Sequence, residues 1–156
     1  MSCLEYRVFE GHPAPEVMDW ITQVNQELFC FGETSERLSN FFRDHKNILS
    51  CMAFREGQPV GFKVGYEDAP HSFESWRGGV VETARRQGIA TELMRLQHSW
   101  CEQKAFRVIK TTTDDSNVPM LTLNRRSGFE VVGSFVHREE QLKLLQEKWL
   151  VPKPTK

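Results

Sequence analysis

The sequence lacks the features of several large protein classes. No apolar run approaches the ~20 residues that a membrane-spanning helix requires. The N-terminus has no charged segment followed by an apolar one, as a signal peptide would. A P-loop and a three-glycine dinucleotide fingerprint are both missing. We therefore expect a cytoplasmic protein that does not bind membranes and does not belong to the common nucleotide-binding folds.

Patterns for metal binding and for disulfides are missing too. The cysteines form no Cys-x-x-Cys pair, and the histidines are dispersed, with no His, Cys or carboxylate cluster at metal-ligand spacing. We expect no metal site, and we interpret the cysteines as reduced, mostly buried thiols. They are Cys3, Cys30, Cys51 and Cys101.

The charge balance gives no sign of a polyanionic partner. The net charge is −1, with 39% hydrophobic and 26% charged residues, whereas nucleic-acid-binding proteins normally carry a strong basic excess. The chain of 156 residues is long enough for one domain with a substantial core. We assign residues 1–150 to a single domain and residues 151–156 to a short C-terminal tail.

The most informative segment covers residues 78–91. Two glycines and the apolar pair Val80-Val81 lead into a basic loop with Arg85 and Arg86, and small residues then open a helix. This order places main-chain N–H groups at a helix N-terminus, where the helix dipole favours an anion. Gly88 leaves room for a phosphate close to the main chain. The segment predicts a phosphate-binding loop, although a helix that starts after an arginine-rich turn would also fit it.

A second segment runs from Asn117 to Phe129. Pro119 suits the first turn of a helix, because its missing N–H costs nothing there. Apolar residues follow at positions that give the helix one apolar side, and Gly128 is suited to end it with a positive φ. A strand is expected to start with Phe129 and to continue through Val132.

Together the two segments resemble the GCN5-related N-acetyltransferases (GNAT family). Arg85-x-x-Gly88-x-Ala90 resembles the acetyl-CoA pyrophosphate loop of that family, and the segment from Asn117 to Gly128-Phe129 resembles its later motif. The resemblance implies a mixed α/β fold: a central, twisted, mixed sheet flanked by helices on both faces. It also implies an acetyl-CoA site. The cofactor-binding residues would be Val80, Val81, Arg85, Arg86, Gln87, Gly88, Ile89, Ala90, Thr91, Asn117 and Asn124.

Local patterns place the other elements. Alternation predicts a strand over residues 6–9, and helical spacing predicts a helix over 15–28 and a second helix capped by Thr34 or Ser35. Strands are expected over residues 48–54 and 59–66, joined by a hairpin turn that contains Gly57. The pattern continues with a strand over 72–81, a helix from Ile89 and a strand over 107–113. We expect these two strands to be neighbours that splay apart.

The last segment is ambiguous from local residues. Residues 139–150 have helical spacing of Leu142, Leu145 and Trp149 and favour helix in composition. The GNAT pattern instead implies two final antiparallel strands. We choose the strand, over residues 144–150, and a homodimer that shares the C-terminal strands would fit this fold.

The resemblance makes Glu74 and Asn124 the candidate catalytic residues. Glu74 matches the position of the catalytic glutamate in the histone-acetylating branch of the family, and a base of this kind needs a raised pKa. A solvated glutamate at a strand end is the alternative, and Glu82 is a competing carboxylate that we do not favour. Gly78 and Gly79 are typical of a bulge or splay that would expose amides to the acyl oxygen, or they simply relieve crowding.

Position 124 departs from the family. Many relatives have a tyrosine there that protonates the leaving thiolate, whereas this chain has Asn124, and its two tyrosines, Tyr6 and Tyr66, are far away in sequence. An asparagine donates a hydrogen bond but gives up no proton near neutral pH. Asn124 would stabilise the thiolate by hydrogen bonding, or water would protonate it.

Two functions remain in view. The first is an acetyl-CoA-dependent N-acetyltransferase (a GNAT-type N-acyltransferase) that acts directly on an amine of a small molecule or of a protein. The alternative is a non-catalytic acyl-CoA-binding sensor or regulatory module with the same fold, which the asparagine at position 124 favours. The sequence does not identify the acceptor amine.

Overall fold

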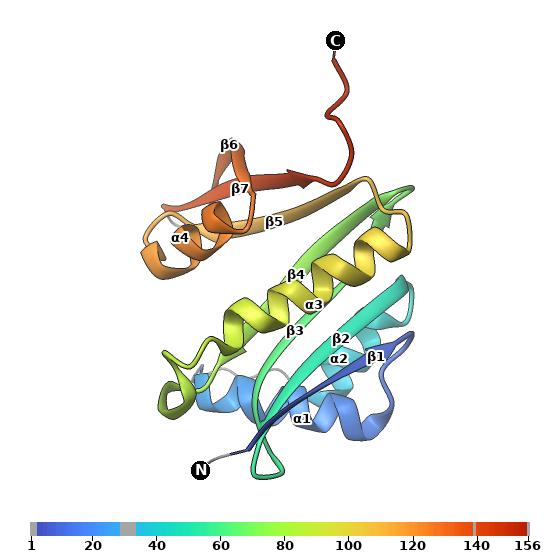
Figure 1. Ribbon diagram of the computed structural model, residues 1–156, viewed down its shortest axis with the longest axis vertical. Coiled ribbons are helices and arrows are strands. Elements are labelled where there is room, and N and C mark those ends of the chain that lie inside the picture. The colour runs from blue at the N-terminus through green and yellow to red at the C-terminus, as the bar shows by residue number, and fades with distance from the viewer. Residues whose placement is uncertain (1–2, 29–33, 139, 156) are drawn as a thin grey trace.

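The computed structural model describes residues 3–28, 34–138 and 140–155. Its strands are β1 (Leu4–Glu10), β2 (Lys46–Arg55), β3 (Gln58–Ala69), β4 (Ser72–Val80), β5 (Val108–Asp114), β6 (Glu130–His137) and β7 (Gln141–Trp149). Its helices are α1 (Pro15–Leu28), α2 (Ser35–Phe42), α3 (Ile89–Gln103) and α4 (Val118–Arg126), with a short 3-10 turn, η1 (Glu82–Ala84). These described elements form a seven-stranded mixed sheet in the order β1-β2-β3-β4-β5-β7-β6 (Figure 1).

The N-terminal elements follow their local sequence signals. Helix α1 buries Val17, Ile21 and Val24 at helical spacing, and the Thr34 side chain caps α2 by accepting a hydrogen bond from the Arg37 N–H. Strands β2 and β3 form the expected antiparallel hairpin, and Gly57 has a φ of +79° in its turn. The predictions for this half of the sheet are confirmed.

Helices cover both faces of the sheet. A Cβ built on Gly61 would meet Ile89 and Leu93 of α3, whereas one built on Gly79 would meet Leu28 of α1. Gly61 pairs with Val80, the neighbour of Gly79 on β4, so the two glycines face opposite sides. The side covered by α3 is called the α3 face here, and the side covered by α1 and α2 is called the α2 face.

Strands β4 and β5 are parallel neighbours for a short distance and then separate. Within the described residues, β4 pairs with β5 through Ser72, Phe73 and Glu74 and no further. In Figure 1 the two strands diverge beyond this point, with α3 below the opening and α4 above it. The predicted splay is therefore confirmed, and the mixed α/β fold with it.

The C-terminal segment is a strand, as chosen. Residues Gln141–Trp149 form β7 between β5 and the edge strand β6, so tertiary pairing overrides the local helical spacing. Gly128 follows α4 with a φ of +104°. Cys3, Cys51 and Cys101 are free thiols, whereas Cys30 and Lys156 lie outside the described residues. None of the described helices is long and apolar enough to cross a membrane.

Candidate active site

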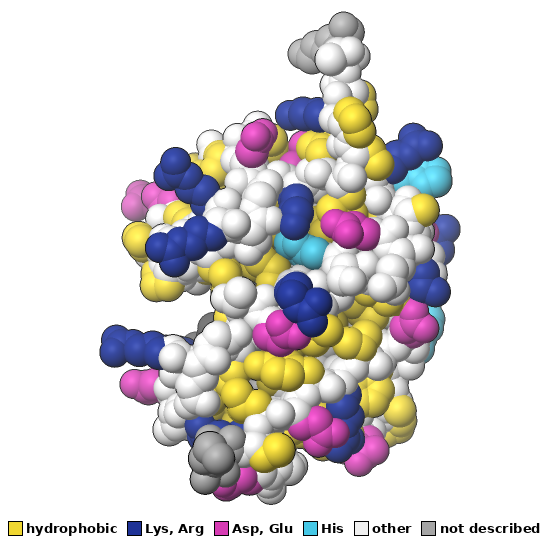
Figure 2. Space-filling view, viewed as in Figure 1, with side chains coloured by type: hydrophobic (Ala, Val, Ile, Leu, Met, Phe, Trp, Pro, Cys, Tyr) yellow, Lys and Arg dark blue, Asp and Glu magenta, His cyan; other side chains and the backbone are white. Residues whose placement is uncertain are grey.

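A cleft opens where β4 and β5 separate. Figure 2 shows a deep notch on this side of the molecule, with Lys and Arg side chains on both of its rims. One side consists of residues 75–91, from β4 to the start of α3, and is called the β4 wall. The other side consists of β5, α4 and β7 and is called the β5 wall. The cleft begins beyond Glu74, because the pairing between β4 and β5 stops at that residue.

Beyond Glu74, the edge of β4 that faces the cleft is no longer paired with β5 within the described residues. Successive N–H groups of a strand point to opposite edges. The Val81 N–H donates to the Val60 oxygen of the neighbouring chain segment at 2.9 Å, so the Val80 N–H points to the other edge, toward the cleft. Unpaired main-chain groups of this kind form a ready template for a ligand with amide groups.

The loop after β4 ends at the N-terminus of α3. Arg85 folds back and its Nε donates to the Val80 oxygen at 3.1 Å. Gly88 has a φ of +77°, and a Cβ built on it would have no heavy atom within 4 Å. Within the described residues no side chain caps α3, so its first N–H groups are free for an anion. Arg86 and Gln87 are exposed in the same loop.

The two glycines of β4 relieve crowding. A Cβ on Gly78 would lie 2.9 Å from the Phe62 oxygen, and one on Gly79 would lie 2.3 Å from a Leu28 methyl. The register shift of β4 lies between Ser75 and Arg77, opposite β3, and thus just before the glycines. The bulge therefore centres on Trp76, and the glycines allow β3 and α1 to pack closely.

Glu74 lies at the last paired position of β4, at the closed end of the cleft. Burial, and then the nearby Asp68 carboxylate, raise the pKa of Glu74 to about 7, while Lys110 opposes the shift. The neighbouring Phe73 does not bury the Glu74 carboxylate, because the Phe73 ring packs against Trp100 and Phe106 on the α3 face. A carboxylate with this pKa can take a proton near neutral pH.

Asn124 and Asn117 are engaged within the protein. Asn124 is 2% exposed, and its Nδ2 donates to Thr113 Oγ1 at 3.2 Å and to Gln146 Oε1 at 2.9 Å. Both amide hydrogens are thus used to tie α4 to β5 and β7. Asn117 caps α4, where its Oδ1 accepts from the Met120 N–H at 3.3 Å.

The structure adds residues that motif reading did not find. Tyr66 of β3 is the register partner of Glu74. Burial, and then the nearby carboxylates of Glu74 and Asp68, raise the pKa of Tyr66. Lys110 pairs with Glu74 from the β5 side. Counting back from the turn at Pro70 and His71 would place Glu67 opposite Glu74, and only the register shift between Glu67 and Ala69 makes Tyr66 the partner.

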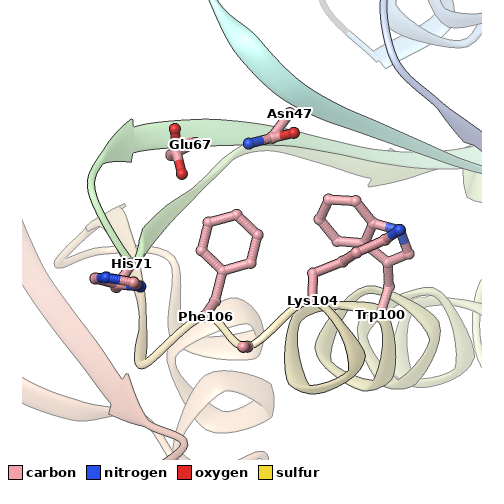
Figure 3. Close-up of a pocket in the computed structure, with 7 residues that line it drawn as sticks. Asn47, Glu67, His71, Trp100, Lys104 and Phe106 are labelled. Atoms are coloured by element: carbon pink, nitrogen blue, oxygen red, sulfur yellow. The ribbon is translucent and has the colours of Figure 1, made fainter.

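A second cavity lies away from these residues. It is a small pocket of about 140 Å³ between the end of α3, with Trp100 and Lys104, and the loop residues His71 and Phe106 (Figure 3). This pocket is at the start of β4, whereas the loop that we predict to bind phosphate follows the end of β4. Nowhere in the described chain do three or more His, Cys, Asp or Glu side chains form a group that could hold a metal ion.

The cleft and its loop agree with a family assignment. The sequence profile of the acetyltransferase (GNAT) family matches residues 14–129, which is most of the chain. The chain belongs to the GNAT family. No curated protein sequence matches it.

Solved structures share the fold at low sequence identity. Ard1 from Thermoplasma volcanium is 15% identical, with a TM-score of 0.79 over 94% of this chain and 98% of that one. The ribosomal-protein-S18-alanine N-acetyltransferase from Escherichia coli is 10% identical, with a TM-score of 0.79 over 96% and 97%. PaiA N-acetyltransferase from Thermoplasma acidophilum, solved in complex with coenzyme A, is 16% identical, with a TM-score of 0.72 over 94% and 99%. These likenesses concern the fold.

Proposed function

We propose that this GNAT protein transfers an acetyl group from acetyl-CoA directly to an amine. One observation carries the proposal: within the described residues, β5 no longer pairs with β4 beyond Glu74, and this edge of β4 leads to a helix N-terminus that no side chain caps. An extended ligand with amide groups at one end and phosphates at the other fits this order of main-chain donors. CoA has that composition, and acetyl-CoA would supply the acetyl group as a thioester.

The residues of the β4 wall are assigned to CoA by their chemistry. The N–H groups from Arg86 to Thr91 hold the pyrophosphate, with the arginines adding positive charge. Val80 and Val81 line the pantetheine arm, and the Val80 N–H is the one that points to the cleft. Glu74 lies six residues before Val80, about 20 Å along the strand, which matches the extended length of such an arm.

Glu74 acts as the general base. It takes a proton from the acceptor ammonium, and the freed amine nitrogen bonds to the acetyl carbonyl carbon while the carbon–sulfur bond breaks. The thiolate leaves with the bonding electron pair. The acylated nitrogen loses its second proton, which reaches the sulfur through water, because Asn124 has no acidic proton to give. A thiol pKa of roughly 8.5 makes such a leaving group tolerable without a strong acid.

The second candidate is a CoA-binding sensor that does not catalyse transfer. Asn124 favours this alternative. Both of its amide hydrogens are already donated to Thr113 and Gln146, and it has no acidic proton at the position where many relatives have tyrosine. A thiol-release assay with a panel of amines separates the two functions. The enzyme releases CoA in proportion to an amine, whereas a sensor binds acetyl-CoA and releases CoA only at the rate of background hydrolysis.

A further inference from the structure

Tyr66 and Glu74 form a pair on the α2 face of the sheet. They are register partners on β3 and β4, and partners of this kind have Cβ atoms about 5 Å apart on one face. Phe41 of α2 packs against Tyr66 at 5.6 Å and stacks on Trp76 at 4.0 Å between ring centroids. The phosphate-binding loop instead leads into α3, which covers the other face.

The ring of Tyr66 is packed by aromatic neighbours, while its hydroxyl has no partner among the described residues. His45 lies 4.2 Å from it, centroid to centroid, and Phe41 packs at its edge. Neither the Tyr66 hydroxyl nor the Glu74 carboxylate has a hydrogen-bond partner within residues 3–28, 34–138 and 140–155. Two polar groups that face the same space at the closed end of the cleft are thus available to a ligand.

A depression adjoins this pair. It has a volume of about 440 Å³ and is lined by Tyr66, His45, Lys46, Asp44, Glu67 and Asp68, and a volume in this range suits a small molecule. Lys46 is neutralised by Glu67 at 3.1 Å, while Asp68 has Lys110 only at 3.8 Å. The lining therefore keeps a negative excess beside an aromatic ring, a setting that attracts a cation.

We infer that the acceptor amine binds on the α2 face, between the Tyr66 hydroxyl and the Glu74 carboxylate, and that the acceptor is a small di- or polyamine whose second cation occupies the depression beside Asp44. The inference rests on the proposed acetyl transfer and names its substrate class. Tyr66 accepts a hydrogen bond from the ammonium and directs the nitrogen toward the cleft. A monoamine would leave Asp44 without a cationic partner, because Glu67 and Asp68 already face Lys46 and Lys110.

Matched acceptors test the substrate class. A linear diamine and the monoamine of equal chain length are compared at saturating acetyl-CoA. We expect the diamine to have a kcat/KM about fivefold higher, the effect of one exposed charge pair. Asp44→Asn should remove this preference, while Asp115→Asn, an exposed aspartate on the other half of the molecule, should keep it.

Tyr66 is tested by removing its hydroxyl alone. Tyr66→Phe keeps the ring packing, and we expect a KM about tenfold higher for either amine, with unchanged acetyl-CoA affinity. Tyr6→Phe is the control, because Tyr6 lies on β1 near Glu92 of α3. An unchanged KM in Tyr66→Phe overturns its role.

The remaining outcomes separate this inference from the proposed function. Equal use of the two small amines, or transfer only to a peptide amine, overturns the substrate class while acetyl transfer stands. Binding of acetyl-CoA without transfer to any amine overturns the acceptor site and supports the sensor. Failure to bind acetyl-CoA overturns the proposed function itself.

Discussion

The two walls of the cleft use their polar groups in opposite ways. In the part of the chain that the structure describes, β5 does not pair with β4 beyond Glu74 and no side chain caps α3, so the β4 wall presents main-chain N–H groups such as that of Val80 to the cleft. In the β5 wall, polar side chains satisfy one another, as Asn124, Thr113 and Gln146 do. Buried polar groups normally have partners, so free groups point to a ligand and mutually bonded ones to a structural role. We therefore propose that the β4 wall binds CoA and that the polar groups of the β5 wall contribute to stability.

The largest effect is expected at the closed end, where the walls meet. Glu74→Gln should lower turnover by about 10²–10⁴-fold, the usual worth of general-base catalysis, and leave acetyl-CoA affinity nearly unchanged. Wild-type activity should rise with pH through about 7 and then level off, because the base must be ionised. Glu82→Gln, which removes the exposed carboxylate after β4, should turn over like the wild type. Normal turnover by Glu74→Gln would place the base elsewhere.

The same residue gives a stability prediction. The pKa of Glu74 is raised from 4.5 to about 7 in the folded protein, so the folded state binds its proton more tightly than the unfolded state does. Its contribution to stability is full below pH 4.5 and is lost as pH rises through about 7. Denaturant unfolding should therefore show a fall in stability over this window that Glu74→Gln flattens. An identical pH dependence in both proteins would refute the shift.

A negative charge placed in the predicted phosphate-binding loop should weaken the binding of acetyl-CoA to the β4 wall. Gly88→Glu adds a carboxylate beside the pyrophosphate and a side chain at a φ of +77°. We expect the Kd for acetyl-CoA, measured by calorimetry, to rise about 100-fold, or about 2.7 kcal/mol. Gly57→Glu is the matched control, because Gly57 has a φ of +79° in the β2–β3 turn. Equal affinity in both variants would count against the loop.

A truncation in the β5 wall should affect stability rather than binding. Asn124→Ala leaves Thr113 and Gln146 without their donor, and we expect a loss of about 2 kcal/mol in the free energy of unfolding. The exposed Thr122→Ala on the same helix should cost much less. Acetyl-CoA affinity of folded Asn124→Ala should stay near the wild-type value, whereas a large loss of turnover without a loss of stability would restore a catalytic role for Asn124.

The smallest effect concerns the bond that joins the walls. Thr111 Oγ1 donates to the Ser75 main-chain oxygen at 3.0 Å, one residue beyond the last β4–β5 pair, Glu74 and Lys110. Thr111→Val should lower stability by about 1 kcal/mol, while Thr112→Val, at the exposed neighbour, should have little effect. Thermal unfolding of the two variants measures the difference, and equal stabilities would show that the bond is unimportant.

The sequence predicted the parts of this molecule that local patterns determine. Apolar spacing and the Thr34 cap located α1 and α2, and the glycine and arginine pattern located the loop before α3. The partners of Asn124 are separated from it by 11 and 22 residues, and no local pattern connects them. The Trp76 bulge depends on how β3 and β4 pair, and so does the Tyr66–Glu74 pair. Contacts between distant segments decide these features.

Hydrogen exchange on addition of CoA would show whether CoA binds along the β4 wall. We predict slower exchange of the amides from residue 76 to residue 91, including Val80 and Ile89, because the β4 wall gains hydrogen-bond partners. The amides of β6 and of the β2–β3 hairpin should exchange at an unchanged rate. Protection confined to other segments, or no protection at saturating CoA, would contradict the assignment of CoA to the β4 wall.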